Sequence, residues 1–185
     1  MDEFGKMGKD EGGCRLPKRK RNRLKDFDYR QTGMYFITVC TKGRCGILGQ
    51  IIADDKNNVG AAFCRPTEVG EIVKQEILGI ARVYSNVVVD NYVIMPNHVH
   101  MLVSITNSSG HEETEVSGRQ DAAPTISRII NQWKRAVSMK TGGSVWQKSF
   151  YDHVIRNEKD YLQTAEYIVN NPALWYEDQY YCYAK

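Results

Sequence analysis

Two β-type runs separated by only two residues constrain the fold of this 185-residue chain more than any other feature. The first run spans 87–95 and the second spans 98–105, and Val, Ile and Met dominate both. The intervening Pro96-Asn97 is a tight-turn signal, so the two runs are predicted to form a β-hairpin. A hairpin of this kind favours an antiparallel sheet over a doubly wound parallel sheet.

The rest of the chain fits the same antiparallel class. Apolar residues at helical spacing predict helices, and Asn157 and Pro172 mark the expected start and end of the last helix. The order β-β-α-β-β-α-β-α predicts an α+β fold, a ferredoxin-like antiparallel sheet with helices packed on one face. Besides the hairpin, the predicted strands are 34–41, its partner 47–52 and the extended segment 146–156; the helices are 66–84, 124–139 and 157–171; and a surface loop covers 106–123.

The composition, with 42% hydrophobic and 25% charged residues, is that of a soluble globular protein. No run of 18 apolar residues is present, so no membrane span or membrane partner is expected, and the N-terminus lacks the apolar stretch of a secretory signal. Five cysteines without Cys-x-x-Cys spacing favour reduced thiols and a cytoplasmic location.

Positive charge is concentrated near the N-terminus. Residues 15–25, RLPKRKRNRLK, hold seven Lys or Arg and no acid, whereas the net charge of the whole chain is only +3. Such a segment can bind phosphates and release their counterions, although a solvated tail that aids solubility is the alternative. The expected organisation is a flexible basic arm over 1–25, one domain over 26–178 and a tail over 179–185.

His98 and His100 begin the second run of the predicted hairpin. In a strand, residues i and i+2 point to the same face, so the two imidazoles could hold one metal ion while Val99 packs on the opposite side. The spacing leaves an alternative open, because paired histidines on a strand also serve packing or hydrogen bonding.

Tyr167 lies off the apolar stripe expected for the last helix, and its helical neighbours are polar. A tyrosine there is either an amphipathic surface residue or a functional one. Asn171 stands one turn beyond it, and its amide oxygen is a candidate third metal ligand. Such a site would leave metal positions open for phosphate oxygens, and an adjacent phenol could attack a phosphodiester to form a phosphotyrosine. The expected stripe is Tyr161, Leu162, Ala165, Ile168 and Val169.

Three segments in this order resemble the single-tyrosine HUH transposases: M-P-N-H-V-H-M-L-V, W-Q-K-S-F-Y-D-H-V-I-R-N and Y-I-V-N-N-P. The basic opening K-R-K-R-N-R-L-K and the strand Y-F-I-T-V-C-T are also similar to that family. The resemblance covers about residues 18–175. It is strongest to the REP-associated tyrosine transposases, which are relatives of the IS200/IS605 transposases.

The resemblance implies a ferredoxin-like HUH domain that cleaves and joins single-stranded DNA with Mg or Mn, through a covalent 5'-phosphotyrosine intermediate. His98 and His100 match the metal-binding pair, Tyr167 matches the nucleophile, and Asn171 takes the third-ligand position, where the family often has Gln. It also implies DNA hairpins such as REP-like palindromes as partners, a place in the bacterial nucleoid, and a monomer rather than a homodimer.

Several alternatives stay open at this level. The chain could bind hairpin DNA without cleaving it, as a domesticated relative, or it could be a metal phosphoesterase that uses water instead of Tyr167. His153 and Arg156 lie in a shared motif without an assigned role, and a structural role is favoured over a DNA contact for His153. Three aromatic residues are expected in the core rather than as base-stacking platforms: Trp146, Phe150 and Trp175. Phosphate contacts are expected from basic residues of the arm and of the second helix: Lys18, Arg19, Lys20, Arg21, Arg23, Arg128, Lys134 and Arg135.

Overall fold

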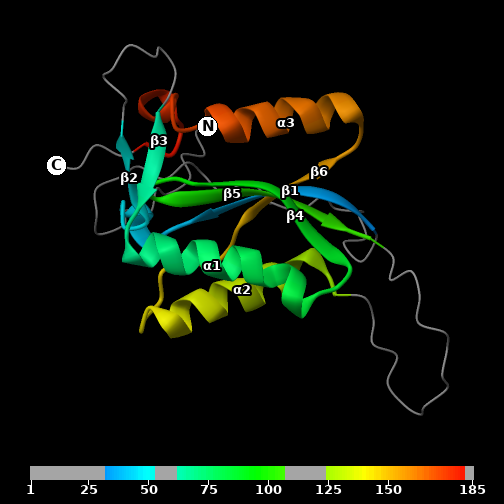
Figure 1. Ribbon diagram of the computed structural model, residues 1–185, viewed down its shortest axis with the longest axis horizontal. Helices are drawn as coiled ribbons and strands as arrows, with labels where there is room; N and C mark the ends of the chain where they lie inside the picture. Colours follow the sequence, from blue (N-terminus) through cyan, green and yellow to red (C-terminus); the bar gives the residue numbers. More distant parts are fainter. Residues whose placement is uncertain (1–31, 53–61, 107–123, 182–185) are drawn as a thin grey trace, which may run out of the picture.

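The computed structural model describes residues 32–52, 62–106 and 124–181. The predicted basic arm and most of the predicted loop over 106–123 lie outside these residues. Within them, a four-stranded antiparallel sheet with the order β4-β5-β1-β6 forms the centre of the molecule (Figure 1). This sheet confirms the predicted α+β class. Its strands are β1 (Gly33–Cys40), β4 (Val87–Ile94), β5 (His98–Ile105) and β6 (Tyr151–Ile155).

The predicted hairpin is present as β4 and β5. Ile94 pairs with Val99, and the turn closes through a 2.8 Å hydrogen bond from the Met95 amide to the His98 carbonyl. On its other edge β5 pairs with β1, where Val39 lies opposite Val99 and Thr38 lies opposite His100. Strand β5 therefore has a hydrogen-bonded neighbour on each edge, which fixes the direction of its side chains.

The prediction that 47–52 pairs with the first strand is wrong. Both edges of β1 are occupied by β5 and β6, so no edge remains for this segment. Instead, β2 (Gly49–Ile52) pairs with β3 (Phe63–Pro66) in a separate two-stranded sheet. The turn after β1 contains a short 3-10 helix, Lys42–Arg44, with positive φ at Gly43 and Arg44, and this turn directs the chain away from a hairpin.

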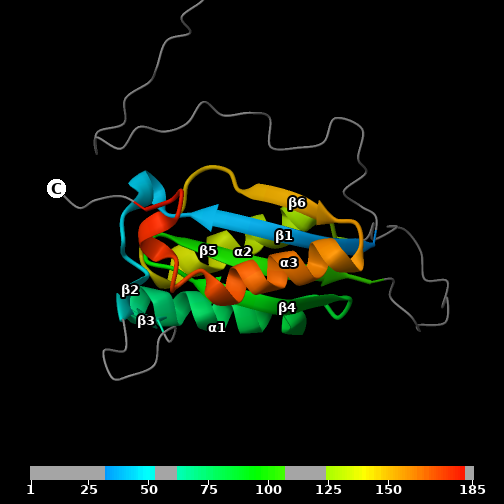
Figure 2. The ribbon, with the colours of Figure 1, turned by 90° about the horizontal axis from the view of Figure 1, so that it is seen from above.

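Three helices cover the two faces of the described sheet. Helices α1 (Glu68–Val83) and α2 (Ile126–Lys140) lie on one face, over a core that includes Ile37, Val99 and Met101. Helix α3 (Glu158–Asn170) crosses the opposite face (Figures 1 and 2). The expectation of helices on one face therefore holds for α1 and α2 but not for α3, because β5 also buries side chains such as Leu102 on the second face.

Side chains cap the starts of the helices, including Asn157, which was expected from the sequence. The Thr67 hydroxyl accepts from the Gly70 amide at 3.2 Å, and the Asn157 side chain accepts from the Asp160 amide at 2.9 Å. Trp146 and Phe150 are buried, as expected. Of the helices described, none has both the length and the apolar character that a bilayer span requires.

Two glycines of α1 give a matched test of the packing between this helix and the start of β2. A Cβ at Gly70 would overlap the backbone oxygen of Leu48, whereas a Cβ at Gly79 would meet no atom within 4 Å. We expect Gly70→Ala to lower the free energy of unfolding by about 1–3 kcal/mol through overpacking. Gly79→Ala should raise it by about 0.5–1 kcal/mol, because alanine favours the helix. Urea unfolding of both variants checks this, and equal effects would contradict the described contact.

Candidate metal and tyrosine site

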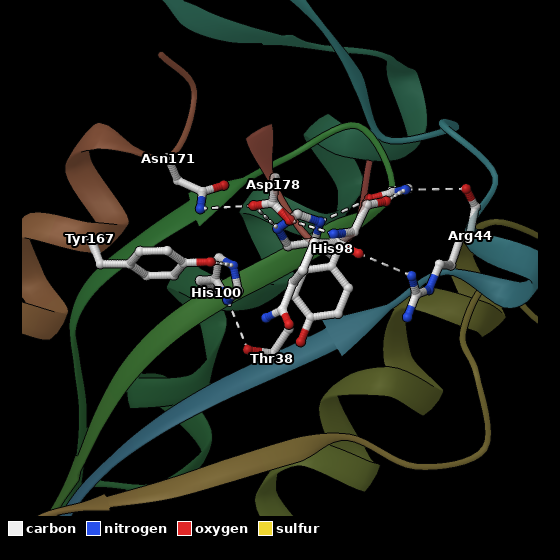
Figure 3. A network of polar contacts seen from close by, with 10 residues as sticks. Thr38, Arg44, His98, His100, Tyr167, Asn171 and Asp178 are labelled. Carbon is white, nitrogen blue, oxygen red and sulfur yellow. Dashed lines mark hydrogen bonds and ion pairs between the residues drawn. The ribbon is translucent and has the colours of Figure 1, made fainter. Parts of the chain in front are cut away.

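Strand β5 directs alternate side chains to opposite faces of the sheet, and this places His98 and His100 together. Val99 lies in the core with α1 and α2, as predicted, while both imidazoles face the side covered by α3. The two ring centroids are 4.5 Å apart, and each side chain is at most 1% exposed. Figure 3 shows both rings converging on one polar cluster.

Both imidazoles are held neutral by burial. Burial lowers the pKa of His100 to about 3. Burial also lowers the pKa of His98 well below its usual range, and the neighbouring His100 and Arg44 side chains lower it further. A neutral imidazole has one protonated nitrogen and one nitrogen with a free lone pair, which is the form that binds metals.

Each histidine has a hydrogen-bond partner at Nδ1. His100 Nδ1 lies 2.8 Å from the Thr38 hydroxyl, and His98 Nδ1 lies 2.8 Å from the Asn97 side-chain oxygen. Partners at this position orient a ring so that Nε2 is presented to a ligand. The Nε2 atoms of both residues therefore face the centre of the site.

Asp178 is a candidate ligand that the sequence analysis missed. It follows the short 3-10 helix Trp175–Glu177, and its Oδ2 lies 4.0 Å from His98 Nε2. One ligand atom each from His98, His100 and Asp178 lie within 4.8 Å of one another. Atoms about 2.1 Å from a shared octahedral ion lie roughly 3–4 Å apart, so the cluster is close to the size that a divalent ion requires. No spacing pattern in the sequence connects Asp178 with the histidines.

Asn171, the predicted third ligand, also lies at this cluster. It is 1% exposed, and its Nδ2 donates to Asp178 Oδ2 at 3.1 Å (Figure 3). Its Oδ1 and the Nε2 of His98 are both buried without a hydrogen-bond partner. Buried acceptors of this kind are costly unless something binds them. The donor set of two imidazoles, a carboxylate and an amide oxygen therefore fits a divalent metal ion.

Tyr167 extends from α3 toward the same cluster. Its hydroxyl lies 3.4 Å from His100 Nε2, and its ring makes an edge contact with Phe36. Burial and the nearby Asp178 carboxylate raise the pKa of the phenol. Tyr167 is still 36% exposed as a whole residue, so this phenol lies near the imidazoles and is partly open to solvent.

The apolar stripe predicted for α3 is only partly correct. Ile168 is buried, but Leu162 and Val169 are 57% and 67% exposed. The helix rests on the sheet along a narrow line through Thr164, Ile168 and Asn171, and Tyr167 lies at the edge of this line. The buried face of α3 is narrow because the helix packs only on the sheet; in the described part of the chain no second helix lies beside it.

Tyr180, which lies two residues after Asp178 and within the predicted tail over 179–185, forms a wall of the site. The Tyr180 ring lies 4.7 Å from the His98 ring, and the Tyr180 carbonyl accepts from the Asn97 side chain at 2.8 Å. The Arg44 guanidinium lies 5.1 Å from the centre of the Tyr180 ring. Trp175, buried as expected, approaches the His98 ring at 6.0 Å.

Other candidate residues lie away from the site. Lys134 is buried, and its ammonium group donates to the carbonyls of Gln147 and Ser149, so it packs α2 rather than facing a nucleic acid. Arg128 and Arg135 are exposed on α2, on the far face of the sheet from α3. The candidates Lys18, Arg19, Lys20, Arg21 and Arg23 lie outside the described residues.

His153 and Arg156 anchor the start of α3. His153 Nε2 lies 3.0 Å from Asp160 Oδ2, and the Arg156 amide donates to the same oxygen at 3.2 Å. These contacts connect β6 to the first turn of the helix that carries Tyr167. The favoured structural role of His153 agrees with this geometry.

Comparison with known proteins relates the chain to a transposase family. No protein-family model matches it. An uncharacterized Haemophilus influenzae protein is 35% identical over 175 residues, which are 88% of this chain and 93% of the relative. The REP-associated tyrosine transposase of Escherichia coli is 29% identical over 84 residues, which are 45% of this chain and 43% of that protein.

A solved structure supports the relationship at the level of the fold. It is the REP-associated tyrosine transposase bound to a REP hairpin, which matches with a TM-score of 0.53 and 21% identity over 85% of this chain and 73% of that one. The sequence similarity and the shared fold identify this chain as a distant homologue of the REP-associated tyrosine transposases.

Proposed function

We propose that this protein cleaves single-stranded DNA at or near hairpins and transfers the cut strand through a covalent 5'-phosphotyrosine at Tyr167. One observation carries this proposal: a half-buried phenol hydroxyl lies 3.4 Å from an imidazole nitrogen of a cluster that can hold a metal. A tyrosine in that position is poorly explained as a surface or core residue, because it is placed beside groups that would hold and polarise a phosphate.

Under this proposal His98, His100 and Asp178 hold a divalent ion, Mg or Mn, and Asn171 supplies a further oxygen. The bound ion would supply positive charge that polarises the scissile phosphate and favours the ionised form of the nearby phenol. The protein's own groups favour the neutral phenol instead, because burial and the Asp178 carboxylate raise the pKa of Tyr167. Oxygen and imidazole ligands are compatible with both metals.

In the proposed reaction Tyr167 exchanges one phosphodiester bond for another. The phenol oxygen attacks the phosphorus atom, a bond forms between them, and the bond from phosphorus to the 3' oxygen breaks. The 3' oxygen leaves with a proton as a free hydroxyl, and the 5' phosphate stays on Tyr167. Attack by a free 3' hydroxyl on this phosphotyrosine reverses the exchange and joins strands, so the energy of the broken ester is conserved.

Hairpin DNA is the proposed partner because a related transposase has been solved bound to a REP hairpin. The basic arm over 15–25 is proposed to contact phosphates, and Arg128 and Arg135 remain candidates only for DNA that extends around the sheet. We propose that the protein acts as a monomer in the bacterial cytoplasm, with one catalytic domain that begins near residue 26.

A second candidate function is binding of hairpin DNA without cleavage. It is favoured by the complete burial of His98 against Trp175 and Tyr180, which leaves that imidazole without contact to solvent. This function predicts salt-sensitive DNA binding that is unaffected by chelators and by His98→Ala. A mobility-shift assay with and without EDTA separates it from the cleavage proposal.

Metal binding is tested by thermal unfolding with Mn2+. Binding at about 100 times the Kd stabilises a protein by about 2.7 kcal/mol, so we expect Mn2+ to raise the Tm of the wild type. His100→Ala should lose most of this increase, since it removes a ligand from the cluster. His153→Ala, the matched variant outside the cluster, should retain it. An equal Mn2+ effect in wild type and His100→Ala would place the ion elsewhere and contradict the proposed site.

Nucleophilic attack is tested with a single-stranded hairpin oligonucleotide carrying a label at its 3' end. We expect the label to move onto the wild-type protein in Mn2+, because the 5' phosphate of the 3' fragment stays on the tyrosine. Tyr167→Phe should form no adduct, whereas Tyr161→Phe, on the same helix, should form it. Denaturing electrophoresis measures this transfer. An adduct in Tyr167→Phe that disappears in Tyr180→Phe would assign the wrong phenol, and cleavage without any adduct would indicate a phosphoesterase that uses water.

A further inference from the structure

We propose that Asn97 is a positioning residue that fixes the tautomer of His98, so that Nε2 of this ring presents a lone pair to the site. The inference rests on the proposed function only in the use of that lone pair for a metal. The tautomer itself follows from hydrogen bonds within the protein and can be measured without metal or DNA.

The orientation of the Asn97 amide is determined by two backbone carbonyls. Asn97 is 2% exposed, and its Nδ2 donates to the Tyr180 carbonyl at 2.8 Å and to the Arg44 carbonyl at 3.3 Å. A carbonyl oxygen can only accept a hydrogen bond, so the NH2 group must face these two atoms. The opposite orientation would bring oxygen against oxygen at both contacts. Oδ1 of Asn97 therefore points to His98 Nδ1, at 2.8 Å.

This orientation decides which nitrogen of His98 carries the proton. Oδ1 can only accept, so His98 Nδ1 must donate and carry the hydrogen. His98 is fully buried, which disfavours a charged ring, so the neutral ring carries its one hydrogen at Nδ1 and has none at Nε2. Nε2 is the atom that lies 4.0 Å from Asp178 Oδ2 without a hydrogen-bond partner. The lone pair thus faces the carboxylate and the free oxygen of Asn171.

The main chain of Asn97 is also held in place. The Thr41 amide donates to the Asn97 carbonyl at 2.9 Å, and the Thr41 hydroxyl shares its hydrogen between this carbonyl, at 3.0 Å, and that of Cys45, at 2.8 Å. The residue thereby connects the turn after β1, the start of β5 and the segment around Tyr180. His100 differs, because its Nδ1 partner is the Thr38 hydroxyl, which can donate or accept and therefore does not dictate a tautomer. Of the two histidines, only His98 has its tautomer imposed by an amide.

The test uses full-length protein with 15N-labelled histidine and long-range 15N–1H spectra, recorded without metal at mildly alkaline pH. We expect His98 of the wild type in the Nδ1–H form, although free neutral histidine favours Nε2–H. Asn97→Ala should shift His98 toward Nε2–H and weaken Mn2+ binding about 10–100-fold, as loss of a group that orients a metal ligand does. Asn86→Ala is the matched control, because Asn86 is also buried and also donates to a carbonyl, that of Thr106, away from the site.

Asn97→Asp separates this role from a purely structural one. The carboxylate keeps an acceptor at His98 Nδ1 but loses both bonds to the carbonyls of Arg44 and Tyr180. We expect the protein to become less stable while His98 keeps the Nδ1–H form and most of its Mn2+ affinity. A wild-type spectrum with His98 in the Nε2–H form overturns the inference, even where no variant folds, and so does an unchanged tautomer in folded Asn97→Ala. A wild type with the Nδ1–H form that binds no Mn2+ supports the tautomer assignment and contradicts only the proposed metal function.

Discussion

The structure depends on β5 being buried on both faces while it is hydrogen-bonded on both edges. Val99 and Met101 enter the core with α1 and α2, and His98 and His100 enter the layer beneath α3. Because side chains alternate with a period of two, a shift of one residue in register would move the imidazoles into the apolar core and valine into the polar cluster. The pairing of β5 with β1 and β4 thus fixes the core and the site by the same set of hydrogen bonds.

The polar cluster beneath α3 is difficult to explain as a stabilising feature of the protein alone. It places two neutral imidazoles, a carboxylate and an amide in a region that water hardly reaches, and it leaves His98 Nε2 and Asn171 Oδ1 without partners. Each buried group without a partner opposes folding by about 1–3 kcal/mol. A divalent cation would remove this cost, because the free acceptors could bind it and its charge would offset that of Asp178. The groups that oppose folding are therefore the same ones that a metal site needs.

Residue spacing within a single strand or helix predicted the site residues that lie on the same element. It could not predict contacts between segments that are distant in the sequence. The i, i+2 spacing of His98 and His100 was sufficient to place both rings on one face, and the one-turn spacing of Tyr167 and Asn171 placed both over that face. Asp178 could not be found in this way, since it reaches the histidines only through the chain reversal after α3. The pairing of β2 with β3 was missed for a related reason: which segments meet at an edge depends on the edges already occupied, and β6 takes the free edge of β1 far along the sequence.

The two histidines differ in access, and this difference bears on how the proposed reaction can proceed. His98 is sealed by the rings of Trp175 and Tyr180, and its lone-pair direction is imposed by Asn97. His100 borders Tyr167, an α3 residue that is 36% exposed. His98 is therefore enclosed and rigidly oriented, whereas His100 adjoins a phenol that is partly open to solvent. A phosphate that meets both the ion and the nucleophile has its direct approach along α3, whereas an approach over His98 would require the segment around Tyr180 to leave its carbonyl and ring contacts.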